Sequence, residues 1–421
     1  MNFTRKQYLL AVASVLLGVS SMVCRASRES RPYERITLNI TSDPATSVAV
    51  TWRSASTHTS TVVQVASALE SGKPSEKVKS HKGQCTAFES DSTEVFYHSA
   101  VIRGLRPDTS YAYRVGAKPE WSKWHFFRTA ARNSGSFSFI YLGDLQNRLV
   151  ERCREVIDKA YDTCPDAAFI LKVGDLVNLG SWDEQWAEWY AASDSVVRRI
   201  PIAPLPGNHE YGRSLTPFWR AGFTLPENGP TNLHETAYYF DCNGARIVAM
   251  NSMEKIEQQA KWLDNVLKDN TNNWTIVAMH YPLYSSTGAR DNPRLRKHWQ
   301  PVFDKRKVDI VFAGHDHTYS RTGFMKHEPD ISHGKEASES ESGTIYITSV
   351  SGPKFYPLNR RPYMRCSGEH MQLFQVVNIK PERLEYIAYK KNRKKHDYFV
   401  LLKGSNGATR LQEESCSGRQ K

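Results

Sequence analysis

The sequence contains no Cys-x-x-Cys pair, although it has seven cysteines in 421 residues. This absence excludes the closely spaced thiols of zinc ribbons and of thioredoxin-type redox centres. The apolar stretch near the N-terminus, Tyr8–Val23, is short for a helix that spans a membrane. The 56 Lys and Arg outnumber the 44 Asp and Glu, which suits anionic partners. The basic residues are scattered, however, and no aromatic and basic module for nucleic acid is visible, so no nucleic-acid partner is expected.

The N-terminus has the pattern of a targeting segment. Basic residues precede Tyr8–Val23, and small residues follow it closely, as in a signal peptide. Cleavage near Ala26 would remove residues 1–26. An alternative is a lipid anchor at Cys24, which would be the only membrane attachment. Both interpretations predict an exported protein that is periplasmic, secreted or anchored at the cell surface.

The remaining six cysteines allow 15 pairings, and export would permit disulfides. Buried free thiols are an equal alternative. These cysteines are Cys85, Cys153, Cys164, Cys242, Cys366 and Cys416.

The basic run Lys390–His396 lies between two strand-like segments. We expect either a solvated hairpin turn or a patch that binds anions.

Residues 34–130 have the alternating apolar pattern of an all-β domain. The alternation is clearest at Ile36, Leu38 and Ile40, at Val48, Val50 and Trp52, and at Tyr111, Tyr113 and Val115. The string Leu105–Tyr111 is similar to the corner of a fibronectin type III domain. That resemblance implies a β-sandwich in which the Tyr111 hydroxyl bonds to upstream backbone.

Residues 136–403 alternate between strands and helices, which predicts an α/β domain with a largely parallel sheet covered by helices. Residues 404–421 are expected to form a tail, and Met325–Ser342 is expected to be a polar loop. The expected strands are Ser136–Leu142, Ala168–Val173, Ile200–Leu205, Ile247–Asn251, Thr275–Met279 and Asp309–Phe312, and strands return from Gly343 to Lys403.

Three helices are expected between these strands. The second begins with a capping box at Ser181 and Glu184, and its apolar stripe is assigned to the core. The first has Val150, Cys153, Val156, Ile157, Ala160 and Tyr161 on one face, the stripe of the second contains Trp182, Trp186, Trp189 and Tyr190, and the third runs from about Glu254 to Leu267.

Polar residues follow the carboxyl ends of these strands, where open α/β sheets bind their ligands. Such carboxylate, amide and imidazole groups suit divalent first-row metals or iron. Each of five short motifs is, by itself, a common turn or a chance occurrence, but the five motifs in this order point to one site. They are Gly143-Asp144, Gly174-Asp175, Gly207-Asn208-His209-Glu210, Val277-Ala278-Met279-His280 and Gly314-His315-Asp316-His317.

These five blocks resemble the calcineurin-like metallophosphoesterase family. With the fibronectin-like N-terminal domain, the chain looks like the purple acid phosphatase branch, from about residue 35 to about residue 403. The resemblance implies an enzyme that uses two metal ions to hydrolyse phosphate esters, most simply phosphomonoesters of small molecules. Asp175 would bridge the metals, Asp144 and His317 would bind the first, and Asn208, His280 and His315 would bind the second.

The resemblance implies one further catalytic residue beside the metal ligands. His209 is expected to be the general acid that protonates the leaving group. Tyr281, Arg290, Asn292 and Arg321 are expected in loops that border the site, and Arg290 has the planar fork that matches phosphate oxygens.

Two positions depart from the family pattern. Asn178 stands where purple acid phosphatases have tyrosine, and Gln146 stands where most metallophosphoesterases have histidine. Gln146 could bind the first metal through its amide oxygen, and Asn178 is a weaker candidate. We therefore expect a colourless pair of divalent ions, Mn, Zn or Fe(II).

Two other functions remain open from the sequence. The same metal site could cleave phosphodiesters or nucleotide pyrophosphate bonds, because the loops determine the substrate. A non-catalytic binding protein is the more remote alternative, and the presence of Asp175 and Asn208 argues against it.

Overall fold

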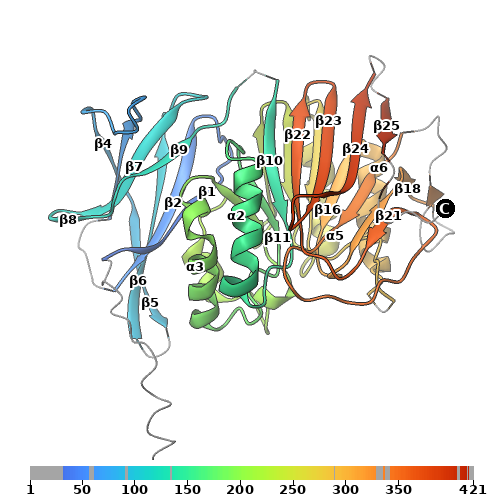
Figure 1. Cartoon of the computed structure of the whole chain (residues 1–421), viewed down its shortest axis with the longest axis horizontal. Helices are drawn as coiled ribbons and strands as arrows, with labels where there is room; N and C mark the ends of the chain where they lie inside the picture. The colour runs from blue at the N-terminus through green and yellow to red at the C-terminus, as the bar shows by residue number, and fades with distance from the viewer. Residues whose placement is uncertain are drawn as a thin grey trace, which may run out of the picture.

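The computed structural model describes residues 32–414 and Cys416, except 56–60, 91–92, 133–134, 289, 329–334, 337–341 and 405–407. The predicted targeting segment, including Cys24, lies outside the described residues. A β-rich part forms one side of the molecule and a larger α/β part the other (Figure 1).

The N-terminal part is a β-sandwich, which confirms the predicted fold of this region. Its two inner faces enclose a core that includes Leu38, Val50, Val63 and Val115. The backbone N–H of Arg106 donates to the Tyr111 hydroxyl at 2.9 Å, so the expected tyrosine corner is present. The strands are β1 (Glu34–Asn39), β2 (Ser47–Ser54), β3 (Val62–Ser67), β4 (Lys79–Lys82), β5 (Gln84–Ser90), β6 (Thr93–Arg103), β7 (Ser110–Ala117), β8 (Glu120–Trp121) and β9 (His125–Arg128).

The second part is built of β-sheets flanked by helices, which confirms the predicted α/β class, but it contains two large mixed sheets, so the expectation of one largely parallel sheet was wrong. Parallel pairing is confined to the centre of each sheet, and antiparallel strands from the C-terminal region flank it. One sheet contains β10 (Phe137–Leu142), β11 (Ile170–Val173), β12 (Ile202–Leu205), β22 (Leu373–Lys380), β23 (Arg383–Lys390), β24 (Lys395–Lys403) and β25 (Thr409–Glu413). The other contains β13 (Tyr238–Cys242), β14 (Ala245–Ala249), β15 (Trp274–Ala278), β16 (Ile310–Ala313), β17 (Tyr319–Thr322), β20 (Ile345–Thr348) and β21 (Met364–Gly368), and β18 (Met325–Lys326) pairs with β19 (Lys335–Glu336).

Helices cover the outer faces of these two sheets. Side chains alternate between two cores along each central strand: on β15, Ile276 and Ala278 face the core shared by both sheets, whereas Val277 faces the outer helices. Figure 1 shows α2 and α3 side by side, with α2 next to β10 and β11 and α3 nearer to β1. The helices are η1 (Leu149–Cys153), α2 (Arg154–Thr163), α3 (Asp183–Val197), η2 (Asn208–Glu210), α4 (Pro217–Gly222), α5 (Ile256–Lys268) and α6 (Pro293–Arg306).

One sheet runs through both parts of the molecule. Strand β1 of the sandwich pairs in parallel with β12, which extends the sheet to eleven strands. Arg35 on β1 reinforces this junction, because its guanidinium is buried and contacts Asp183 of α3 at 2.6 Å. The same Asp183 carboxylate accepts from Arg53 of β2 at 2.7 Å.

Two details of the expected helices were wrong. Helix α3 begins at Asp183 without a side-chain cap, and Trp182 is 55% exposed. The loop before α3 is held instead by Gln185, whose side-chain oxygen accepts from the backbone N–H of Asn178 and Leu179. Val150 is 40% exposed because η1 is wound as a π-helix, which shifts it off the face predicted from 3.6-residue spacing.

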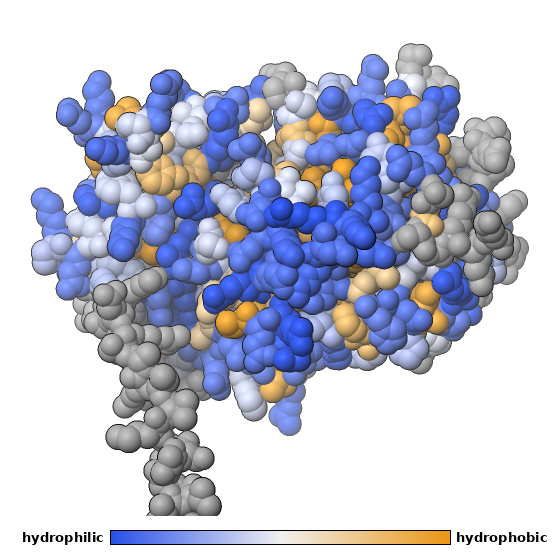
Figure 2. Space-filling model, in the orientation of Figure 1, coloured by the Kyte–Doolittle hydropathy of each residue, from blue (hydrophilic) through white to orange (hydrophobic). Residues whose placement is uncertain are grey.

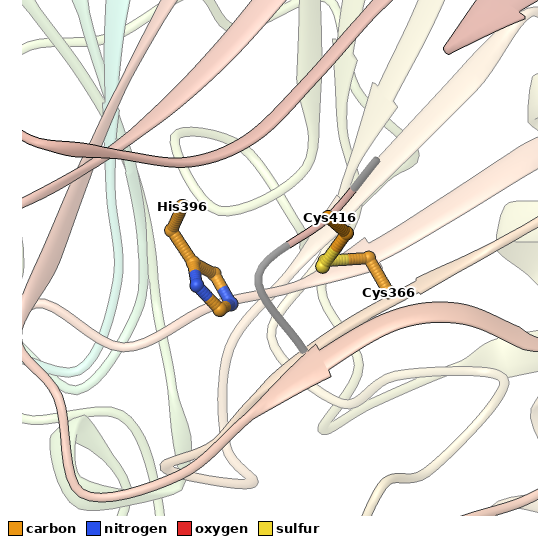
Figure 3. Close-up of side chains that lie close together, drawn as sticks. All are labelled: Cys366, His396 and Cys416. Carbon is orange, nitrogen blue, oxygen red and sulfur yellow. A yellow bond between two sulfur atoms is a disulfide. The ribbon is translucent and has the colours of Figure 1, made fainter. Parts of the chain in front are cut away.

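Two cysteines form a disulfide, and this pairing was left open by the sequence. Cys366 of β21 joins Cys416, which follows β25, and His396 lies beside them (Figure 3). Because both sulfur atoms are in the bond, this cluster does not offer thiolates to a metal. The described free cysteines are Cys85, Cys153, Cys164 and Cys242.

The basic run is a hairpin turn between β23 and β24, as one of its two interpretations predicted. Lys391 pairs with Glu155, and Arg393 pairs with Asp162 at 2.8 Å. These acidic partners favour the solvated turn over a patch that binds anions.

The surface view in Figure 2 is mainly hydrophilic, with hydrophobic atoms in small separate groups. None of the helices among the described residues has both the length and the apolar character needed to cross a bilayer.

Lys172 on β11 is a buried cation without a hydrogen-bond partner. Its ammonium group lies 5.1 Å from the centre of the Trp189 ring. Burial lowers the pKa of Lys172 to about 7, whereas its pKa in the unfolded chain is near its usual value of about 10.4. The folded state therefore binds fewer protons between these two pH values, and stability should rise with pH across that window.

We expect Lys172→Met to stabilise the protein by about 3 kcal/mol below pH 7, because it removes the cost of a buried charge. The advantage should shrink as the pH rises from 7 to 10, since the wild-type amine is then neutral. Urea unfolding at several pH values measures the effect. Lys268→Met, at an exposed position of α5, is the control, and an equal gain in both variants would contradict the explanation.

Candidate metal centre

Five strand ends deliver polar side chains to one place. Asp144, Asp175 and Asn208 follow β10, β11 and β12 of the first sheet, and His280 and the His315/His317 pair follow β15 and β16 of the second. Parallel strands of one sheet end at the same edge. The edges of the two sheets meet here, since His280 of the second sheet lies 3.3 Å from Asp175 of the first. All six side chains lie in this one region.

The backbone at these residues is held in an uncommon conformation. Asp144, Asp175, His315 and His317 have positive φ angles of 49°, 50°, 73° and 51°, a region that non-glycine residues rarely adopt. Such strain is typical of functional sites, where surrounding structure enforces it.

Two glycines let the strand-end loops approach each other closely. A Cβ atom at Gly207 would overlap the Asp175 carboxylate, and one at Gly314 would overlap the Asp144 carboxylate. Any side chain at either position would displace an acidic group of the site.

The acidic and imidazole groups form two overlapping sets. Asp175, His280 and His315 offer ligand atoms within 4.8 Å of one another, and Asp144, Asp175 and His317 do the same. Asp175 belongs to both sets and is 1% exposed. The arrangement could hold two cations with Asp175 between them.

Hydrogen bonds fix which nitrogen of each histidine faces the site. The Nδ1 of His280 lies 2.8 Å from the carbonyl oxygen of Val173, and the Nδ1 of His317 lies 3.0 Å from that of Lys354. A nitrogen beside a carbonyl carries the proton, which leaves Nε2 as the free donor to a metal. The Nε2 of His280 lies 3.1 Å from the Asn208 side-chain oxygen and 3.3 Å from Asp175.

Burial and mutual contacts shift the pKa values of Asp144 and Asp175 in opposite directions. Desolvation holds the pKa of Asp144 well above its usual value, and the neighbouring Asp175 adds to this. Burial would also raise the pKa of Asp175, but contacts with His280 and His209 hold it below its usual value.

The histidines of the two sets also differ. Burial opposes the charge on His280, but Asp175 outweighs it and raises the pKa of His280 to about 9. Burial and nearby cations lower the pKa of His315 to about 2 and of His317 to about 3. Neutral imidazole is the form that binds metals, so His315 and His317 can bind metals over the physiological pH range.

Gln146 has a buried side-chain oxygen without a hydrogen-bond partner. Its side-chain nitrogen lies 3.4 Å from the Asn178 side-chain oxygen, which leaves the Gln146 oxygen as the group that lacks a partner. A buried acceptor of this kind is rare unless it binds something, so the donor set fits a cation near Asp144.

His209 lies beside Asp175 but is not a member of either set. Its Nδ1 lies 2.5 Å from the Asn178 carbonyl oxygen, and its Nε2 lies 3.8 Å from the Asp175 carboxylate. Its side chain is 24% exposed, whereas that of His280 is fully buried. His209 can therefore be reached from solvent at the edge of the site.

Glu210 is a structural residue that the sequence analysis did not single out within its block. Its buried carboxylate accepts from the backbone N–H of Asp175, Leu176 and Gly207 at 2.8–2.9 Å. Desolvation and the nearby Asp175 raise the pKa of Glu210 to about 7. A carboxylate directly after His209 was the available signal, but only the fold shows that it ties two strand-end loops together.

Two of the four expected rim residues, Arg290 and Tyr281, contact a ligand candidate of the site. Arg290 reaches the His315 carbonyl oxygen at 2.7 Å, and the Tyr281 ring lies 4.2 Å from the His315 ring. Asn292 donates to the carbonyl oxygens of Pro282 and Arg290, so it holds the loop that carries Arg290.

Arg321 does not border the site, and this expectation was wrong. It lies in β17, is 0% exposed and pairs with Asp397 at 2.6 Å. The strand continues past the His317 turn into the sheet, so Arg321 is part of a buried ion pair.

Comparison with family models finds two matches. Residues 33–129 match the model for the purple acid phosphatase N-terminal domain, and residues 137–319 match the model for calcineurin-like phosphoesterases. The second match contains all six strand-end ligand candidates.

Curated relatives and solved structures give the same picture. The chain is 28% identical to purple acid phosphatase 21 of Arabidopsis thaliana over 63% of this chain and 62% of that protein. It is 27% identical to the Fe(3+)-Zn(2+) purple acid phosphatase 12 of the same plant, over 62% of this chain and 60% of that protein. The chain thus spans about three fifths of the length of these relatives.

Among solved structures, a purple acid phosphatase from yellow lupin (Lupinus luteus) seeds superposes with a TM-score of 0.75 at 17% identity. The match covers 90% of this chain and 75% of the lupin chain. PhoD superposes with a TM-score of 0.66 at 13% identity, over 93% and 94% of the two chains. At these identities the superpositions establish the fold.

Proposed function

Because the chain belongs to the calcineurin-like phosphoesterase family and carries the N-terminal domain of purple acid phosphatases, we propose that it hydrolyses phosphate esters with two bound metal ions. Phosphomonoesters of small molecules are the proposed substrates. The observation that carries the proposal is the position of Asp175, a buried carboxylate common to two sets of metal-binding groups.

The ligand residues divide between two metal positions in this proposal. Asp175 would serve both positions, Asp144, His317 and the Gln146 side-chain oxygen would hold one ion, and Asn208, His280 and His315 would hold the other. Two bound ions would supply a hydroxide near neutral pH, because they lower the pKa of water from about 15.7 toward 7.

His209 is the proposed general acid. The Asn178 carbonyl oxygen fixes its Nδ1–H, so its Nε2 is the nitrogen that faces Asp175 and can give a proton to a leaving oxygen. Arg290, Tyr281 and Asn292 are the proposed substrate-binding residues. Arg290 would contact phosphate oxygens directly, and Asn292 supports its loop.

The nearest alternative is a phosphodiesterase or nucleotide pyrophosphatase with the same ligands. Hydrolysis of p-nitrophenyl phosphate and of bis-p-nitrophenyl phosphate, before and after metal removal by a chelator, separates these activities. We expect metal-dependent hydrolysis with a preference for the monoester. Full metal content without hydrolysis of either compound would instead support a non-catalytic binding protein.

We expect the purified enzyme to be colourless, with two divalent ions such as Mn, Zn or Fe(II). The reason is that Asn178 occupies the position at which a tyrosinate would give a charge-transfer band with Fe(III). Metal analysis and a visible absorption spectrum of the same sample check this. A strong band in the purple region would contradict it.

We also infer that the protein is exported, either secreted, periplasmic or lipid-anchored through Cys24. The Cys366–Cys416 disulfide supports this, because disulfides persist mainly in oxidising compartments.

A further inference from the structure

Two cationic side chains meet at one aromatic ring beside the metal ligands. The Arg290 guanidinium carbon lies 4.4 Å from the centre of the Tyr356 ring, and the Lys354 ammonium nitrogen lies 5.4 Å from it. The distance between the two cations is therefore at most the sum of these two distances.

Both cation-bearing segments contact the two histidines that follow β16, His315 and His317. Arg290 lies 3.1 Å from the His315 Nε2, and the Tyr356 ring lies 4.8 Å from the His317 ring. The Lys354 backbone carbonyl holds the Nδ1 of His317 at 3.0 Å. The cations thus border the metal centre itself.

Neither cation has a carboxylate partner within the described part of the chain. Neighbouring arginines do: Arg296 pairs with Asp291, and Arg365 pairs with Glu336. Arg290 and Lys354 are half-buried, so their charges are less screened than those of fully exposed side chains. Two unneutralised cations at a partly buried site favour an anionic ligand.

The segment that carries Lys354 and Tyr356 is anchored at both ends. Gly352 donates to the Asp144 carbonyl oxygen at 3.1 Å, and Asn359 donates to the Ser286 carbonyl oxygen at 2.8 Å. The position of the cations is therefore set by the same loops that hold the metal ligands.

We propose that Lys354 and Arg290, held against Tyr356, form a second anion subsite that selects substrates with another phosphate group next to the scissile one. The subsite rests on the proposed function, because the metal centre must bind the scissile phosphate. Inorganic pyrophosphate is the smallest compound of this class. The Arg290 fork suits two phosphate oxygens, and Lys354 adds a point charge.

Calorimetric titration of the metal-loaded protein with phosphate and with methylenediphosphonate, a pyrophosphate analogue whose bridging carbon prevents hydrolysis, tests the proposal, with divalent metal in excess of either anion. We expect wild type to bind methylenediphosphonate at least tenfold more tightly than phosphate, since one charge-assisted contact contributes about a factor of ten. Lys354→Met should reduce this ratio about tenfold, and Lys354→Arg should restore most of it. Because His317 is held by the backbone carbonyl of Lys354, all three proteins should contain the same amount of metal.

A wild-type ratio near one, or a ratio that Lys354→Met leaves unchanged, would overturn the subsite. Equal weakening of both anions would overturn it as well, since Lys354 would then act on the scissile phosphate alone. Turnover of p-nitrophenyl phosphate by the same samples is a separate readout: its absence refutes the proposed hydrolase, whereas the binding ratio decides on the subsite.

Discussion

Replacement of Asp175 by alanine is expected to remove bound metal and to reduce phosphomonoester hydrolysis by about 10³-fold or more. Asp175 belongs to both sets of ligand groups and is fully buried, so its loss affects both metal positions. A bound metal contributes several kcal/mol to the transition state, and each 1.36 kcal/mol is a factor of ten in rate. Metal analysis of the purified variant and kcat for p-nitrophenyl phosphate measure the two effects.

Thermal unfolding provides the control for the Asp175 variant. Added metal should stabilise wild type, by about 2.7 kcal/mol at a hundred times the dissociation constant, and should leave the Asp175→Ala variant unchanged. The metal-free variant should still fold, because it loses a carboxylate that disfavours charge on Asp144. Retention of two ions by this variant would show that Asp175 does not bridge them.

The His209→Ala variant should keep its metal and lose turnover, mainly for substrates with poor leaving groups. His209 lies at the solvent edge of the site, with its Nε2 3.8 Å from Asp175, and a general acid contributes about 10²–10⁴-fold. A poor leaving group needs protonation more than p-nitrophenolate does. We therefore expect a large loss of kcat for an alkyl phosphate and a smaller loss for p-nitrophenyl phosphate.

The matched control is His234→Ala, at an exposed position outside the site, which should behave as wild type. If His209→Ala loses as much metal as Asp175→Ala, then His209 is a ligand and its assignment as the acid is wrong. An equal loss of rate for both substrates would point to a positioning role instead.

The strand-end residues could be predicted because one local rule links sequence to position. An apolar strand of a parallel sheet ends at a shared edge, so Asp144 and Asp175, which follow paired strands, had to lie near one another once their strands were identified. His280 follows a strand of the other sheet, and only the fold places it beside them. The alternation of Ile36, Leu38 and Ile40 identified the sandwich in the same way. That alternation follows from backbone geometry, because successive side chains of a strand point to opposite faces.

The local signals failed where tertiary contacts override them. Ser181 has the spacing of a helix cap, yet Gln185 fixes the loop and α3 begins two residues later. Val150 has helical spacing, but η1 is wound differently. Arg321 follows the metal-binding block closely, yet its strand carries it away to pair with Asp397.

Long-range pairings had no sequence signal at all. The β1–β12 contact joins residues about 160 positions apart and depends on how two sheets align. The Cys366–Cys416 bond was one choice among many. Lys354 and Tyr356 lie far along the chain from Arg290, and only the fold brings the three together.

The shared eleven-stranded sheet has a practical consequence for protein production. A shortened gene that began at Phe137, where the α/β part starts, would leave the hydrogen-bonding groups of β12 without β1. Uncovered strand edges recruit other chains and promote aggregation. The smallest soluble fragment that retains the six ligand candidates should therefore start before β1, and the sandwich is better regarded as an integral part of the fold than as a removable module.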